Sequence, residues 1–196
     1  VAATVRAGLG ELTMIDCSLD LGQVVLTGSV PVHGGRVVVS RFGHLKPDDA
    51  LRAWLKLCLV NACHGVQTID GALLLGKRSK SLRCPDPDQA TTILRGLVRL
   101  RAEGLTRVLP LPLRTAAAYC NVLTFERGQH SDRARAAFAK ENENWAYFFS
   151  TYSELVASRP VPHDPAPPGG ALGSRFETLA AWLFVPININ LREWRP

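Results

Sequence analysis

The amino-acid sequence predicts a mixed α/β domain. Runs rich in β-branched residues lie at 24–32 and 36–42, residues 12–19 alternate weakly between apolar and polar, and residues 68–75 return to strand character. Apolar residues recur every three or four positions over 47–64 and 87–104, which is the spacing of amphipathic helices. Because strands and helices alternate in the first half and helices dominate the second, we expect a mixed sheet flanked by helices, with extra helices at the C-terminus.

The first elements have clear boundaries. His33-Gly34-Gly35 joins the second and third runs, so residues 24–42 are expected to form a β-hairpin with glycines in its turn. Pro47, Asp48 and Asp49 are typical of a helix N-terminus, and Gly65 is typical of a helix end. Trp54 lies on the apolar stripe of this helix and is expected in the core.

The elements of the second half are predicted from the same kinds of boundary residues, which are less distinct there. A basic loop is predicted from Gly76 to Arg83, and Asp86-Pro87 opens a helix that ends at Gly104. The other predicted elements are an extended segment at 107–113, helices at 115–125 and 131–155 (broken near 142–144), an irregular proline-rich loop at 159–173, and a last helix at 175–184 that ends before Pro186.

Length and composition predict one globular domain over residues 1–196. The chain has 46% hydrophobic and 20% charged residues, which excludes a disordered chain. We expect a core over about 10–125 and a helical extension over about 126–196. The first residues lack an initiator methionine and a secretory signal, so the sequence is expected to be a C-terminal piece of a larger protein. Five cysteines without a CxxC pair favour reduced thiols in the cytoplasm, and no apolar stretch is long enough for a membrane helix.

The positive charge is concentrated in one window. Residues 76–114 hold nine basic and three acidic side chains, a difference equal to the whole net charge of +6. Arginine forks match phosphate and carboxylate groups, so the window suits a polyanion or an acidic protein partner. A solvated helix face explains the same pattern, and the sequence does not choose between these interpretations.

Motifs of common enzymes are absent from the sequence. It contains no phosphate loop, dinucleotide fingerprint, HExxH or nucleophile elbow. Cys58, Cys63 and His64 are close in sequence, but Cys58 lies on an apolar helix stripe and the spacing is not that of a tetrahedral metal site. Core packing is therefore favoured over a metal site or a nucleophile pair, and no cofactor is expected.

The hairpin and the helix after it resemble the frame of restriction-endonuclease-like, PD-(D/E)XK nucleases. In that family one strand carries a metal-binding aspartate, and the next ends in an acid, one residue and a lysine before a helix. Here Pro31 stands at the first acid, Ser40 at the second and Phe42 at the lysine. The resemblance therefore implies a nuclease frame without its catalytic residues, because Mg²⁺ needs carboxylate ligands.

Nearby acids leave a rival interpretation open. Asp16, Asp20 or Asp70 would be the relocated metal ligands of an active nuclease, in which case their replacement by alanine abolishes cleavage. Asp48 and Asp49 have the simpler role of capping the helix after the hairpin.

Longer segments resemble the C-terminal domain of RecC, the gamma subunit of exodeoxyribonuclease V (RecBCD). The resemblance covers residues 41–62, 72–85 and 97–119, and more loosely 134–138 and 175–187, whereas 144–173 departs from the family. It implies a non-catalytic domain that acts as a scaffold for RecB- and RecD-like subunits and in DNA strand handling during double-strand-break repair and recombination. The implied DNA- or partner-binding residues are Lys77, Arg78, Lys80 and Arg83. A free-standing nucleic-acid-binding protein is disfavoured because residues 76–114 contain no aromatic side chain.

Overall fold

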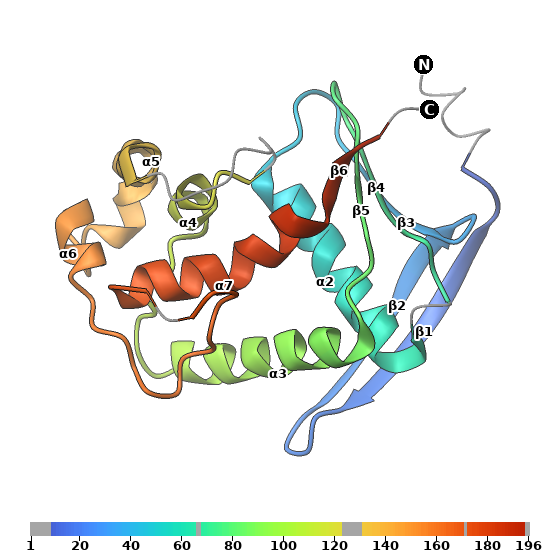
Figure 1. The fold of residues 1–196 in the computed structure, drawn as a ribbon, viewed down its shortest axis with the longest axis horizontal. Helices are drawn as coiled ribbons and strands as arrows, with labels where there is room; N and C mark the ends of the chain where they lie inside the picture. The colour runs from blue at the N-terminus through green and yellow to red at the C-terminus, as the bar shows by residue number, and fades with distance from the viewer. Residues whose placement is uncertain (1–8, 66–67, 123–130, 171, 195–196) are drawn as a thin grey trace. The chain divides into compact units, whose positions relative to one another are not determined.

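The computed structural model describes residues 9–65, 68–122, 131–170 and 172–194. They form two compact units, one made by the chain up to Arg99 together with the segment from Asn190 onward, and the other by 100–189. The first unit carries a sheet and the second is helical, so the predicted mixed α/β class with C-terminal helices is confirmed (Figure 1). The predicted division of a single domain near residue 125 stays a prediction.

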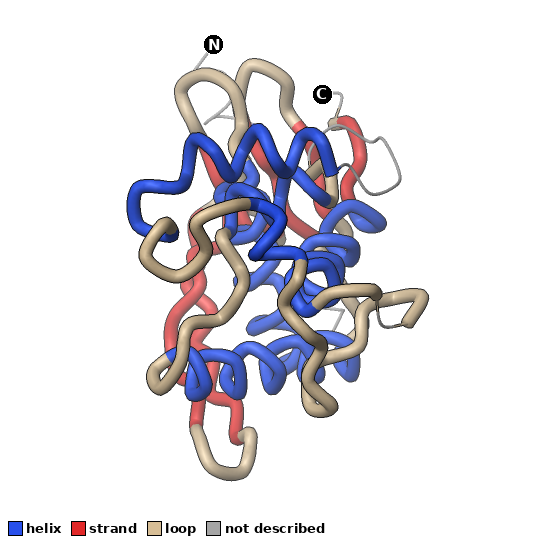
Figure 2. The backbone as a smooth tube through the Cα atoms, turned by 90° about the vertical axis from the view of Figure 1, so that its left-hand side faces the viewer, coloured by secondary structure: helices blue, strands red, loops and turns tan. Residues whose placement is uncertain are grey.

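A six-stranded sheet organises the first unit. Its strands follow chain order from β1 to β6, and all neighbours are antiparallel except β3 and β4, which are parallel. The strands span Leu12–Asp20 (β1), Val25–His33 (β2), Arg36–Ser40 (β3), Gly71–Leu75 (β4), Lys80–Leu82 (β5) and Leu191–Glu193 (β6). Figure 2 shows the strands in red, with the β1–β2 hairpin ending in a free loop.

The predicted hairpin is confirmed as β2 and β3. Gly34 and Gly35 occupy its turn with φ angles of 51° and 78°, a backbone conformation that side chains other than glycine disfavour. The two strands pair beside the turn, where Val32 faces Val37 and His33 faces Arg36. The long arm of β2 instead pairs with β1 along its whole length.

Helix α2 (Pro47–His64) connects the parallel strands β3 and β4 and packs against β1, β3 and β4. It begins at the predicted proline and ends before Gly65. Trp54 and Cys58 are fully buried, as the apolar stripe predicted. The sheet face beneath the helix is closed by alternate side chains of the central strands, namely Val30, Val32, Val37, Val39, Ala72, Leu74 and Leu82.

Two predicted boundaries near the sheet were wrong, and one strand was not predicted. The basic segment 76–83 is not a continuous loop, because Lys80–Leu82 pairs with both β4 and β6. The last helix does not end before Pro186, since α7 continues from Arg175 to Asn190. Phe184 and Ile187 are buried on either side of the proline, and this packing offsets the lost backbone donor. Strand β6 follows α7 directly, and its three residues are too few to show a strand pattern in the sequence.

The second unit contains the end of α3 (Pro87–Gly104) together with α4 (Leu113–Tyr119), α5 (Ser131–Trp145), α6 (Tyr152–Val156) and most of α7. The predicted break in 131–155 lies later than expected, after Trp145. Thr151 explains the restart, because its side chain accepts the backbone N–H of Glu154 and caps α6. Phe176 packs edge to face against both Tyr119 and Tyr152, and all three rings are buried in this unit.

The predicted helix at 115–125 is only partly tested, because residues 123–130 lie outside the described residues. Across the described residues, no helix combines the length and the apolar character that a membrane crossing needs.

Candidate nucleic-acid interface

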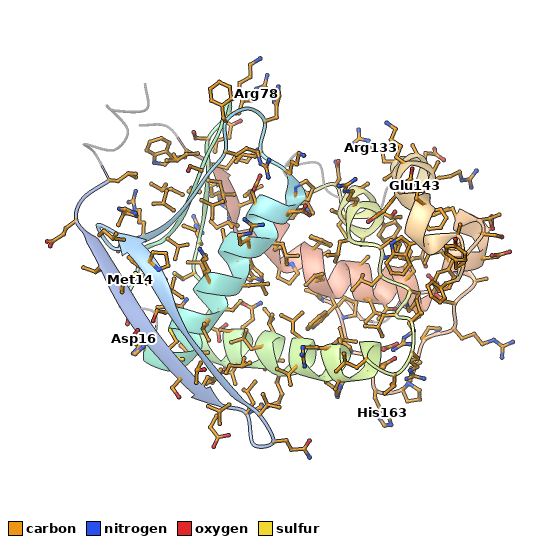
Figure 3. The ribbon with its side chains drawn as sticks, turned by 180° about the vertical axis from the view of Figure 1, so that it is seen from behind. Met14, Asp16, Arg78, Arg133, Glu143 and His163 are labelled. Carbon is orange, nitrogen blue, oxygen red and sulfur yellow. The ribbon has the colours of Figure 1, made fainter. Side chains whose placement is uncertain are left out.

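The turn between β4 and β5 carries two exposed cations. Lys77 and Arg78 lie in the four-residue connection Gly76–Ser79, and Figure 3 shows Arg78 at this end of the sheet. Among the described residues, no acidic side chain forms an ion pair with either of them. Both charges are therefore accessible to an anionic ligand.

The other two predicted binding residues lie in different surroundings. Lys80 is in β5 with a relative exposure of only 9%, and it lies opposite Glu193 in the strand register. Burial lowers the pKa of its ammonium group, while Glu193 acts in the opposite direction. Arg83 is exposed but follows the far end of β5, where its backbone N–H donates to Asn190. The structure therefore exposes Lys77 and Arg78 in one turn, whereas Lys80 lies next to this turn but is buried, and Arg83 follows the far end of β5.

A second loop lies against the basic turn. The N–H of Arg41 donates to the carbonyl of Leu75 at 2.9 Å, and the N–H of Lys77 donates to the carbonyl of Gly43 at 2.7 Å. Figure 1 shows the β3–α2 loop and the β4–β5 turn side by side. We call residues 41–46 and 76–79 together the basic tip. Its exposed side chains include Phe42, His44, Lys46, Lys77 and Arg78.

Asp49 fixes the base of the basic tip. Its carboxylate accepts two hydrogen bonds from the Arg41 guanidinium, at 2.5 and 3.0 Å, and one from the backbone N–H of Lys46 at 2.8 Å. The Arg41 hydrogen bond lowers the pKa of Asp49, although burial acts in the opposite direction. The predicted capping role of Asp49 is confirmed, and the same side chain anchors the loop that precedes α2.

The three positions at nuclease catalytic slots do not form a cluster of acids or bases. Pro31 lies in β2 opposite Met14, Ser40 ends β3 beside Leu75, and Phe42 follows in the basic tip. No carboxylate, imidazole or amine is present at these positions, so their side chains offer no strong ligand for a divalent cation.

The acids of the rival interpretation are dispersed. Asp16 in β1 accepts a hydrogen bond from Ser29, and Asp20 accepts the N–H of Gly22 at 2.7 Å. Asp70 lies 3.9 Å from the guanidinium of Arg36. Over the described part of the chain, no three His, Cys, Asp or Glu side chains come together as a possible metal site.

The surroundings of Cys58 and His64 favour structural roles over catalysis. Burial raises the pKa of Cys58, which favours core packing over a nucleophile. His64 contacts the backbone carbonyl of Asp16 through Nε2 at 2.8 Å. The described residues include five free cysteines, in agreement with the predicted reduced thiols.

The place of Phe42 at a basic surface was not predicted from the sequence. Residues 76–114 contain no aromatic side chain, whereas the structure brings Phe42 to the basic turn from the loop after β3. The order strand, helix, strand in the sequence already indicated that these two segments would meet. Two parallel strands joined by a helix end at the same edge of a sheet, so the residues after 40 and after 75 had to meet there.

Comparison with known proteins decides the family. The family model for the RecC C-terminal domain matches residues 1–124, which is more than half of the chain. The chain belongs to the RecC C-terminal domain family. The match extends over the whole basic tip and over the positions Pro31, Ser40 and Phe42. The RecC resemblance inferred from the sequence is therefore confirmed.

Curated relatives agree with this assignment. The RecBCD enzyme subunit RecC of Mycobacterium tuberculosis strain CDC 1551 / Oshkosh is 32% identical over 120 residues, and so is that of strain ATCC 25618 / H37Rv. Each alignment covers 58% of this chain and 11% of the relative. The chain thus spans about a tenth of the length of these RecC proteins.

Proposed function

We propose that this RecC C-terminal domain is a non-catalytic, nuclease-like module of a RecC-like exodeoxyribonuclease V gamma subunit. In this proposal it acts in the cytoplasm as a scaffold for RecB- and RecD-like subunits and in DNA strand handling during double-strand-break repair and recombination. Membership of the RecC C-terminal domain family supports the proposal most directly.

The strand order supports a restriction-endonuclease-like origin of the fold. An antiparallel arm leads to β3, α2 crosses over, and β4 returns parallel to β3. Pro31, Ser40 and Phe42 follow this frame in the order in which an active nuclease carries its two acids and its lysine. Since none of the three can bind Mg²⁺ as a carboxylate does or act as a cationic lysine, we propose that the frame serves binding and not hydrolysis.

The charge of the basic tip supports contact with DNA. Lys77 and Arg78 are exposed at one end of the sheet, and phosphate contacts by such side chains give salt-dependent affinity without sequence specificity. Arg83 remains a proposed contact at a separate position. Lys80 is proposed to act only indirectly, by holding β5 in place, because it is buried.

DNA binding is tested by fluorescence anisotropy with labelled duplex and single-stranded DNA across a series of salt concentrations. The double variant Lys77→Ala, Arg78→Ala is expected to reduce the slope of log affinity against log salt by about two on duplex DNA, because two phosphate contacts are lost. Lys140→Ala, Arg159→Ala removes the same charge from exposed positions in the helical unit and serves as the matched control. Equal effects of the two double variants would contradict a local phosphate site.

The scaffold role is tested by co-purification with RecB- and RecD-like subunits. The unmodified chain, expressed as part of its full-length subunit, is expected to purify with both partners. Arg78→Ala with Arg83→Ala distinguishes docking from DNA contact. Retained assembly with weakened DNA binding assigns these side chains to DNA, whereas lost assembly with a folded subunit assigns them to a partner.

A further inference from the structure

Phe42 is the most exposed large apolar side chain among the described residues. Its relative exposure is 110%, so its ring has no packing partner in the fold. A phenyl ring left in water gives up the free energy that burial would supply. Phe42 contributes nothing to the core, so any role it has depends on its place at the basic tip.

The backbone around Phe42 is nevertheless fixed. The hydrogen bonds of Arg41 to Leu75 and of Lys77 to Gly43 hold both neighbours of Phe42 against the β4–β5 turn. Gly76 packs tightly there, since a Cβ atom at this position would lie 2.9 Å from Leu45 Cγ. The ring therefore extends from an anchored loop, so ligand binding would cost little conformational entropy in ordering this loop.

Basic residues occupy the loop of Phe42 and the adjacent turn. Lys46 and the imidazole of His44 belong to the same loop, and Lys77 and Arg78 belong to the turn. Arg41 is already paired with Asp49. Asp48 is the exposed acid that follows the loop, so positive charge predominates around Phe42.

We propose that Phe42 is a stacking platform for an unpaired DNA base, with Lys77 and Arg78 binding the phosphates that flank it. This inference rests on the proposed DNA-handling function and names the form of DNA that the basic tip recognises. A single aromatic ring among cations is the combination that single-stranded nucleic acids bind, because every base has a flat face and every nucleotide carries a phosphate. A protein partner would instead favour a cluster of apolar side chains around the aromatic anchor. Within residues 41–46 and 76–79, the half-buried Leu45 is the only other large apolar side chain, although Trp194 donates its backbone N–H to Ser79 at 3.3 Å.

The test uses an oligonucleotide tail that carries 2-aminopurine, whose fluorescence is quenched when the base stacks on an aromatic ring. Binding of the unmodified chain is expected to quench the probe and to be tighter for a tailed duplex than for a blunt one. Phe42→Ala is expected to weaken binding to the tail by about tenfold or more and to abolish quenching, while the salt dependence stays unchanged. Phe42→Trp is expected to restore both affinity and quenching, whereas Phe42→Leu, which is apolar but not aromatic, restores neither.

The outcomes separate this inference from the function on which it rests. Loss of affinity in Lys77→Ala, Arg78→Ala with unchanged affinity and quenching in Phe42→Ala would overturn the stacking platform and leave the phosphate site intact. Absence of DNA binding by the unmodified chain at low salt would overturn both. Equal loss on tailed and blunt duplexes in Phe42→Ala would also overturn the assignment of an unpaired base. Because Phe42 is exposed, we do not expect its replacement to unfold the chain, and circular dichroism of each variant checks that a loss of binding is not caused by unfolding.

Discussion

The backbone N–H of Lys77 donates a hydrogen bond of 2.7 Å to the carbonyl oxygen of Gly43. This contact joins the loop after β3 to the turn after β4. The two segments are more than thirty positions apart in the sequence but meet because β3 and β4 are parallel neighbours. The consequence is one surface that combines Phe42 with the two exposed cations Lys77 and Arg78.

Gly76→Ala is expected to separate these two segments. The new Cβ would lie 2.9 Å from Leu45 Cγ and 3.0 Å from the Gly43 oxygen, so the loop must shift. We expect a loss of about 1–3 kcal/mol in the free energy of unfolding and weaker DNA binding without any change in charge. Gly28→Ala, where a Cβ meets nothing within 4 Å, is the control and should leave both quantities nearly unchanged in urea titrations and anisotropy. Identical behaviour of the two variants would contradict the tight packing at the basic tip.

Asp49 is expected to make stability depend on acid pH. The Arg41 hydrogen bond lowers the pKa of Asp49, so the unfolded chain binds this proton more readily than the folded chain. The stabilisation is complete above the ordinary carboxyl pKa and is lost as the pH falls through the lower pKa of the folded state.

Asp49→Asn tests this coupling by urea unfolding at pH 7 and near pH 3. The variant is expected to lose about 1–2 kcal/mol at pH 7, because the side chain is only 4% exposed and also caps α2. The difference from the unmodified chain should shrink at the acid pH. Asp48→Asn, at an exposed position in the same helical turn, is the control. A difference that is independent of pH would show that the charge of Asp49 is not the stabilising feature.

Arg175 is expected to be essential for the helical unit. Its guanidinium contacts Glu103 at 2.5 Å and Asp164 at 2.8 Å, and its side chain is only 6% exposed. Arg175→Met leaves two carboxylates without their shared cation, so we expect a loss of about 3–5 kcal/mol in thermal or urea unfolding.

Arg107→Ala is the matched control for Arg175. Arg107 also contacts Glu103, at 2.7 Å, but it is mostly exposed to solvent. We expect a loss of less than about 1 kcal/mol. A comparable loss in both variants would indicate that the Glu103 charge, and not the buried Arg175 network, determines the effect.

Thiol reactivity is expected to follow burial. Burial raises the pKa of Cys120 to about 12, and it raises the pKa of Cys17 to about 11 with a further contribution from nearby Cys63. At pH 8 the native chain should therefore be alkylated at the half-buried Cys63 on the order of 100-fold faster than at Cys58 or Cys120. Peptide mass spectrometry after timed alkylation measures the rates. Fast labelling of Cys58 would contradict its place in the core.

Much of the sheet unit was predictable because local signals agreed with the tertiary structure. Paired glycines determined the hairpin turn, and Pro47 with Asp49 determined the start of α2. Elements without such local signals were missed. β5 and β6 are three residues long and exist only through pairing with other strands, and Pro186 is accommodated by burial that a local rule does not contain.

The candidate site was predicted only in part for the same reason. Sequence proximity grouped Lys77, Arg78, Lys80 and Arg83, but strand pairing buries Lys80 and the length of β5 places Arg83 at its far end. The sequence identified Phe42 only as a substituted lysine, and the parallel register of β3 and β4 is what brings its loop beside the turn that carries Lys77 and Arg78. Both the different surroundings of the four basic residues and the position of Phe42 depend on pairing between distant strands, which a single sequence does not reveal.

We propose that this domain binds DNA without cutting it. This is tested by incubating an end-labelled tailed duplex with the purified chain in Mg²⁺, in Mn²⁺ and with a chelator, and by running each sample on native and denaturing gels. We expect a retarded complex on the native gel and full-length labelled strands on the denaturing gel in all three conditions. Shortened strands that require metal and disappear in Asp16→Ala, Asp20→Ala or Asp70→Ala would overturn the proposal and show that the catalytic acids have been relocated.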